Sequence, residues 1–149
     1  MKRALTLTIA AGLAALLVAT LVYVRLAPSD PAIWHVDPNN AADPRASTFA
    51  RIVPGGVTGA DPGSLAARVK DAMLAMPRTR LLAGTVADTH MTFVTRSRLM
   101  GYPDYTSIRI LQDPAGATIA ALARSRFGQY DFGVNAARLN ALKQALTRN

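Results

Sequence analysis

The stretch "YTSIRILQDPAGATIAALARS", residues 105–125, indicates a β-hairpin. Its two arms, residues 105–111 and 116–125, are rich in Thr, Ile and other side chains that favour strands. The segment between them, "QDPAGA", contains the Pro and Gly that mark a turn. We therefore expect two neighbouring antiparallel strands here.

Two similar runs precede this hairpin. "RTRLLAGTV" covers residues 78–86 and "MTFVTRS" covers residues 91–97. Because the links between the four runs are short, we expect an antiparallel meander of four strands. "TFARIV", residues 48–53, would be a short first strand, which makes the sheet five-stranded.

Helical patterns lie on both sides of the four runs. Asp61 and Pro62 are a typical helix start, and Pro77 ends the apolar spacing that follows. The C-terminal segment carries a leucine stripe at helical spacing, with Asp131 as the expected N-cap. The stripe consists of Leu139, Leu142 and Leu146. The order helix, four strands, helix predicts an α+β fold with both helices on one face of the sheet.

The N-terminal residues 4–24, "ALTLTIAAGLAALLVATLVYV", contain no charged side chain. As a helix they would be about 31 Å long, close to the bilayer core of about 30 Å. Arg25 and Leu26 stand where a signal-peptide cleavage site needs small residues. We therefore predict an uncleaved transmembrane anchor within residues 1–27 that contacts membrane lipid. The alternatives are a signal peptide cleaved near residue 27 and a buried core helix.

The charges that flank the anchor predict its orientation. Lys2, Arg3 and the α-amino group outweigh Arg25, so the N-terminus should be cytoplasmic and the remainder should lie across the membrane. Residues 28–47 are rich in proline and predict a tether, with Trp34 docked on the domain or at the lipid headgroups. Residues 48–149 are then a single α+β domain.

The composition limits the classes of partner. Without Lys2, Arg3 and Arg25, the 17 Lys and Arg of the chain become 14 against 9 acidic residues, a net charge of +5. Such a balance suits an anionic lipid, a small anionic ligand or an envelope protein. Nucleic acid is excluded because the arginines form no long run and are not interleaved with stacking aromatics. The chain has no cysteine, so it forms no disulfide.

Two segments leave their strands on the same tripeptide, Arg-Ser-Arg, and reach an Asp three residues after a Gly. If both strands end at one edge of the sheet, their charges converge there. Asn135 continues the leucine stripe backwards, so its amide needs polar partners. The candidate cluster consists of Arg96, Ser97, Arg98, Asp104, Arg124, Ser125, Arg126, Asp131, Asn135 and Arg138.

Three interpretations of this cluster remain open. In the first, Arg, Asp and Asn fasten the last helix to the sheet, with Arg126 neutralising Asp131. In the second, the arginines and the first amides of the last helix bind an anion. In the third, the protein is an enzyme acting on an anionic envelope substrate, with Asp131 or Asp104 as base and arginines stabilising charge.

Other chemistries lack their residues. His35 and His90 are the only histidines, and neither has the spacing of a metal site, so we expect no metal and no cofactor. We expect His90 to lie in a solvated turn. No Gly-x-Ser-x-Gly sequence and no three-glycine nucleotide motif is present.

The run Ser125-Arg126-x-Gly128-x-x-Asp131-x-Gly133-x-Asn135-x-x-Arg138 resembles the hallmark of domain-of-unknown-function family 1499 (DUF1499). "RSRLMGYPDY", residues 96–105, resembles that family's other characteristic stretch, although Asp104 is followed by Tyr105 where the family often has a second acid. The resemblance covers about residues 48–146. It implies a domain common in bacteria and plastids, often beside a membrane anchor and without an established activity. Together with the charge-free span and its flanking charges, this predicts a location in the bacterial inner membrane with the domain in the periplasm.

Overall fold

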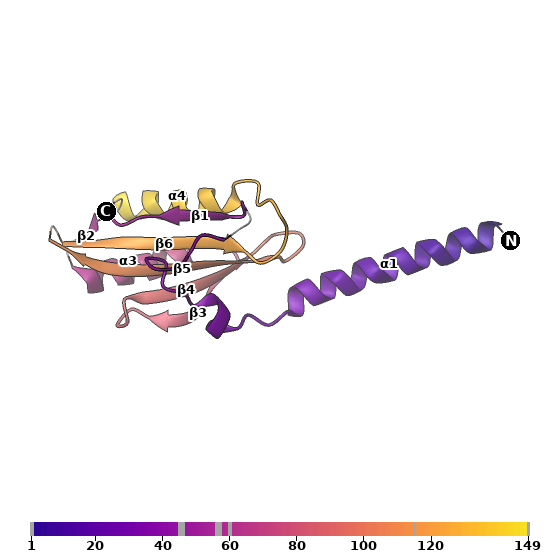
Figure 1. Cartoon of the computed structure of the whole chain (residues 1–149), viewed down its shortest axis with the longest axis horizontal. Coiled ribbons are helices and arrows are strands. Elements are labelled where there is room, and N and C mark those ends of the chain that lie inside the picture. Colours follow the sequence, from indigo (N-terminus) through magenta and orange to yellow (C-terminus); the bar gives the residue numbers. More distant parts are fainter. Residues whose placement is uncertain (1, 45–46, 56–57, 60, 115, 149) are drawn as a thin grey trace.

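The computed structural model describes residues 2–44, 47–55, 58–59, 61–114 and 116–148 (Figure 1). The hairpin is formed by β5 (Pro103–Asp113) and β6 (Gly116–Ser125). It continues the meander of β3 (Thr79–Thr85) and β4 (His90–Arg96), and all neighbours are antiparallel. The predicted four-stranded meander is confirmed.

The sheet continues beyond β6, the last strand of the meander. The expected first strand is β1 (Phe49–Ile52), which pairs with β6, and a two-residue strand, β2 (Thr58–Gly59), pairs farther along β6. The described strands follow the order β1-β6-β5-β4-β3, with β2 beside β6. The five-stranded alternative is therefore confirmed.

Two helices cover one face of the sheet, as predicted. They are α3 (Pro62–Leu74) and α4 (Val134–Thr147). Asp61 begins α3 by accepting a hydrogen bond of 3.0 Å from the Ser64 amide. The core between helices and sheet includes Leu65 and Val69 of α3, Leu142 of α4 and Phe93 of β4. The fold is thus an α+β sheet with its helices on one face.

The opposite face is covered by residues 27–43, which cross the sheet in front of β4, β5 and β6 in Figure 1. They contain a short helix, α2 (Pro31–Trp34), whose Trp34 ring stacks on Tyr105 of β5 at 3.8 Å. Arg109 of β5 pairs with Asp37 at 3.6 Å. Most of the segment that we expected to be a tether therefore packs on the sheet, because it buries the side chains that the helices do not reach. Trp34 docks on the domain, one of the two positions expected for it.

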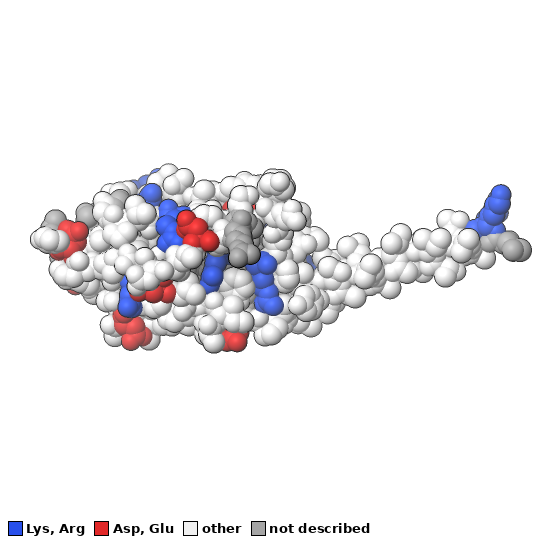
Figure 2. Space-filling view, in the orientation of Figure 1, with Lys and Arg blue, Asp and Glu red and all other residues white. Residues whose placement is uncertain are grey.

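The N-terminal helix α1 (Lys2–Leu26) projects from one end of the domain. It is long and apolar enough to cross a membrane, a property that a signal sequence shares. In Figure 2 its surface is uncharged from the domain to its far end, where basic groups appear. Among the described residues of α1, only those of the last turn touch the domain: Val24 is buried, the Tyr23 ring meets an aromatic ring of the domain, and Arg25 donates a hydrogen bond to the domain. This rules out a buried core helix.

Candidate functional site

The two Arg-Ser-Arg segments meet at the end of the sheet from which α1 projects. We call this end the rim; it comprises the loops of residues 97–102 and 126–133. Asp104 pairs with Ser125 and Tyr105 with Arg124 in the register of β5 and β6. Because side chains alternate along a strand, the candidate residues are divided between the two faces of the sheet.

The face below α4 carries a buried polar network. Arg138 donates to Asp104 Oδ2 at 2.9 Å and to Asn135 Oδ1 at 2.6 Å. The Asn135 amide nitrogen donates to the Thr48 carbonyl and to Ser125 Oγ, each at 3.0 Å. Every polar atom of the Asn135 side chain therefore has a partner, and the network joins α4 to β5, β6 and the residue before β1.

Asp131 serves this network from the loop before α4. Its two carboxylate oxygens accept hydrogen bonds from the Gly133 and Asn135 amides at 3.0 and 3.1 Å. The N-cap itself is Gly133, in a left-handed conformation, so the prediction of Asp131 as N-cap is wrong by two residues. Asp131 nevertheless satisfies two amides at the helix start.

Arg124 and Arg126 point to the other face and hold residues 27–43. Arg124 donates to the Ile33 carbonyl at 3.1 Å and lies 4.7 Å from the centre of the Trp34 ring. Its burial lowers the pKa of the guanidinium. Arg126 donates to the Pro28 carbonyl at 2.7 Å. The expected neutralisation of Asp131 by Arg126 is absent among the described ion pairs, because the two side chains serve different elements.

The first Arg-Ser-Arg segment shapes the turn between β4 and β5. The Ser97 amide donates to the Tyr102 carbonyl at 2.9 Å, and the Tyr102 amide donates to Ser97 Oγ at 3.0 Å. Arg96 donates to the Gly101 carbonyl at 2.8 Å and to the Val24 carbonyl at 3.3 Å. Arg98 is exposed and has no hydrogen bond or ion pair in the described part of the chain.

A pocket of about 530 Å³ lies beside this turn, between the start of β3, the end of β4 and the last turn of α1. Five arginines line it, and no Asp or Glu belongs to the described lining. The arginines are Arg25, Arg78, Arg80, Arg96 and Arg98. We call this the arginine pocket.

Only two of these five arginines were candidates from the sequence. Arg78 and Arg80 carried a usable signal, since they alternate on a run that precedes the one ending in Arg96 and Arg98. Pairing of these runs, with Arg80 opposite Val94, brings the four side chains to one end of the sheet. Arg25 had no such signal, because only the docking of α1 brings it here.

A second hollow of about 300 Å³ lies on the helix side of the rim. Its lining includes Asp104, Ser125 and Asp131 together with aromatic side chains. Both carboxylates are already engaged, Asp104 by Arg138 and Asp131 by backbone amides. The fold thus holds both carboxylates on this side, Asp104 through Oδ2 and Asp131 through both oxygens.

The two histidines meet although they are far apart in the sequence. Their rings stack at 3.8 Å, His35 Nδ1 lies 2.8 Å from Thr92 Oγ1, and His90 Nε2 lies 3.0 Å from the Val36 carbonyl oxygen. Burial, and then the neighbouring His90 and Arg109, lower the pKa of His35. The prediction of a solvated His90 is wrong, because residues 27–43 cover it. The described residues hold no group of three potential metal ligands.

Comparison with known proteins identifies the family of this chain. No curated protein matches the chain. The family model described as "Protein of unknown function (DUF1499)" matches residues 27–146. This range includes residues 27–43, which cover the sheet face opposite the helices, as well as the sheet and both packed helices. The chain belongs to the DUF1499 family.

Proposed function

We propose that this protein is a membrane-anchored binding module that holds an anionic group, such as a phosphate, in the arginine pocket. The observation that carries the proposal is the gathering of five arginines around one pocket without a carboxylate in the described lining. Guanidinium groups bind phosphate through two parallel hydrogen bonds. An anion among the five guanidinium groups offsets their mutual repulsion.

The buried network supports a structural role for the other half of the motif. Asp104, Asn135 and Arg138 satisfy one another, and Asp131 is occupied by backbone amides. An enzyme with Asp131 or Asp104 as base receives less support, because a base needs a lone pair within reach of the substrate proton. Surplus positive charge thus lies in the arginine pocket, while the acids belong to the fold.

We further propose that α1 stays in the bacterial inner membrane and that residues 28–149 lie in the periplasm. The proposal rests on Lys2 and Arg3 before the uncharged helix against the single Arg25 after it. A reporter enzyme that works only outside the cytoplasm, fused after residue 149, should be active and should remain in the membrane fraction. Activity of a cytoplasm-specific reporter there would overturn the orientation, and a released shorter product would overturn the anchor.

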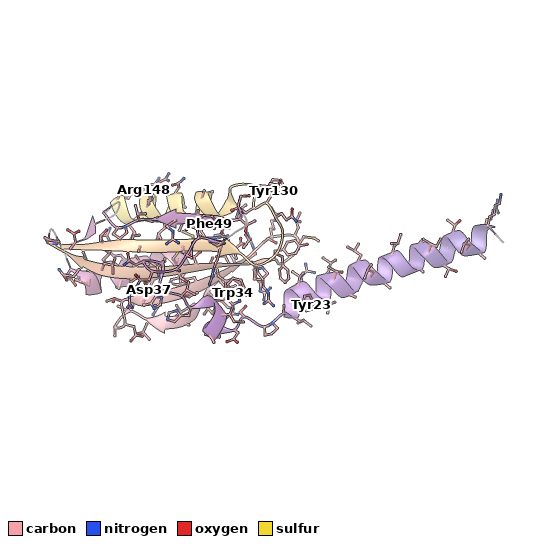
Figure 3. All side chains as sticks on the ribbon, viewed as in Figure 1. Tyr23, Trp34, Asp37, Phe49, Tyr130 and Arg148 are labelled. Carbon is pink, nitrogen blue, oxygen red and sulfur yellow. The ribbon has the colours of Figure 1, made fainter. Side chains whose placement is uncertain are left out.

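The binding proposal is tested by calorimetry of the full chain in detergent with inorganic phosphate and with glycerol 3-phosphate. Arg98→Ala should weaken binding about tenfold, the loss of one charged hydrogen bond, without lowering the melting temperature. Arg148→Ala is the matched control, since Arg148 is exposed at the opposite end of the domain (Figure 3). Absence of anion binding by the parent chain would refute the proposal.

A further inference from the structure

We infer that the rim is a lipid-docking surface, in which Leu99, Tyr130 and Phe132 enter the headgroup layer of the bilayer that holds α1. The inference rests on the membrane anchor of the proposed function and not on the arginine pocket. It assigns a partner, the lipid surface, to the exposed tips of a part of the domain that meets the end of α1.

The rim contacts the end of α1. Arg25 donates to the Leu99 carbonyl at 2.8 Å, and Arg96 donates to the Val24 carbonyl at 3.3 Å. The Tyr23 ring meets the Phe127 ring edge-on at 6.2 Å. The uncharged stretch ends at Val24, so groups that touch Tyr23 and Val24 lie at the boundary of the hydrocarbon core.

Large apolar side chains are exposed at this same end of the domain. The exposed fractions are 79% for Leu99, 72% for Tyr130 and 95% for Phe132. Phe132 has φ of 52°, a backbone conformation that a bulky residue rarely adopts. The loop therefore presents this ring outwards in an unfavourable conformation. Figure 3 shows Tyr130 at the end of the domain nearest α1.

The groups around these side chains are of the kinds found at a membrane surface. Aromatic rings are enriched at the level of lipid headgroups, where one side is apolar and the other is wet. Arg25 and Arg98 are exposed beside them, and long arginine side chains reach phosphates from such a position. The two acids at this end of the sheet, Asp104 in β5 and Asp131 in the rim, are engaged within the protein. Apolar tips beside exposed arginines therefore fit an anionic lipid surface.

Docking of the rim would also set the position of the arginine pocket relative to the membrane surface. Ser97 lines both the pocket and the hollow that contains Phe132, and Arg25 of α1 belongs to the pocket wall. With the rim in the headgroup layer, the pocket opens at the height of the phospholipid phosphates. The anion that it holds would then come from a lipid of the same leaflet.

The experiment uses the full chain reconstituted in vesicles of phosphatidylglycerol and phosphatidylcholine, with bromine on the acyl chains near the headgroup as a quencher. Phe132→Trp and Leu99→Trp report on the rim. Ala87→Trp is the matched control, because Ala87 is exposed in the turn between β3 and β4 at the opposite end of the sheet. The emission of Trp34, the only native tryptophan, is measured in the parent and subtracted.

Both rim tryptophans should be quenched, because rings at headgroup depth lie beside the bromine atoms, while the control should be unaffected. Equal quenching at all three positions, or none at the rim, would overturn the inference. Phosphate binding that persists without rim quenching leaves the binding proposal intact and rejects docking. Rim quenching that occurs without any effect of Arg98→Ala on anion binding supports docking and rejects the pocket.

Discussion

Asn135→Leu tests whether the buried network fastens α4 to the sheet. Asn135 is completely buried and its side chain makes three hydrogen bonds. With leucine, Arg138 and Ser125 each lose a partner, whereas the Thr48 carbonyl keeps the Ser125 amide at 3.0 Å. Leaving a buried polar group unpaired costs about 1–3 kcal/mol, more when it is charged. The apolar gain of about 1–2 kcal/mol offsets part of that.

The expected net loss is about 1–3 kcal/mol, which lowers the melting temperature by roughly 4–12 °C for a domain of this size. Unfolding of the full chain in detergent is followed by the emission of Trp34, which stacks on Tyr105 and so reports on the sheet. Asn140→Leu, an exposed site on α4, is the control and should change stability by less than about 0.5 kcal/mol. A leucine variant at 135 as stable as the parent would refute the reasoning.

Three further outcomes are expected from the same unfolding assay. Arg138→Leu should cost about 3–5 kcal/mol by stranding the buried Asp104, and adding Asp104→Leu should recover part of it; no recovery would contradict the pairing argument. Because the pKa of His35 is lowered in the folded state, the unfolded chain takes up that proton more readily, so stability should be full above about pH 6.5 and fall at lower pH. His35→Phe should flatten this profile, and an unchanged pH dependence would exclude His35 as its source. Gly84→Ala should cost about 2 kcal/mol or more, because Gly84 has φ of 82° and a Cβ there would overlap the His90 carbonyl; parent-like stability would contradict the strain.

The helix-covered half of the fold was predictable because its signals are local. The strand-favouring residues and central turn of residues 105–125 and the leucine stripe of α4 each indicate their own element, and counting back along that stripe identified Asn135 as a buried amide. The identity of its partners was not predictable. That Arg138 joins Asn135 to Asp104, while Arg126 binds the Pro28 carbonyl and not Asp131, depends on how α4 and residues 27–43 pack on opposite faces of the sheet.

Of the cover on the other face, the sequence indicated only that Trp34 could dock on the domain, and the remaining contacts were missed for a different reason. Residues 27–43 have no periodic pattern, and their prolines favour a tether when the sequence is considered alone. Their contacts are made with strands far along the chain, as when Arg109 meets Asp37 or the His35 ring meets His90. Such pairings are decided by tertiary packing, so the histidine stack and the contribution of Arg25 to the arginine pocket could be found only in three dimensions.

Residues 28–43, which cover the sheet face opposite the helices, have a consequence for biogenesis. The hydrogen bonds that hold them join residues made early to residues made late: Arg124 binds the Ile33 carbonyl, 91 positions away, and Arg126 binds the Pro28 carbonyl, 98 positions away. Residues 28–43 leave the ribosome early, but the strand that receives them is translated nearly last. The sheet therefore cannot receive its complete cover until β6 has been made. Until then the surfaces of β4 and β5 that residues 28–43 bury stay open to proteases and chaperones.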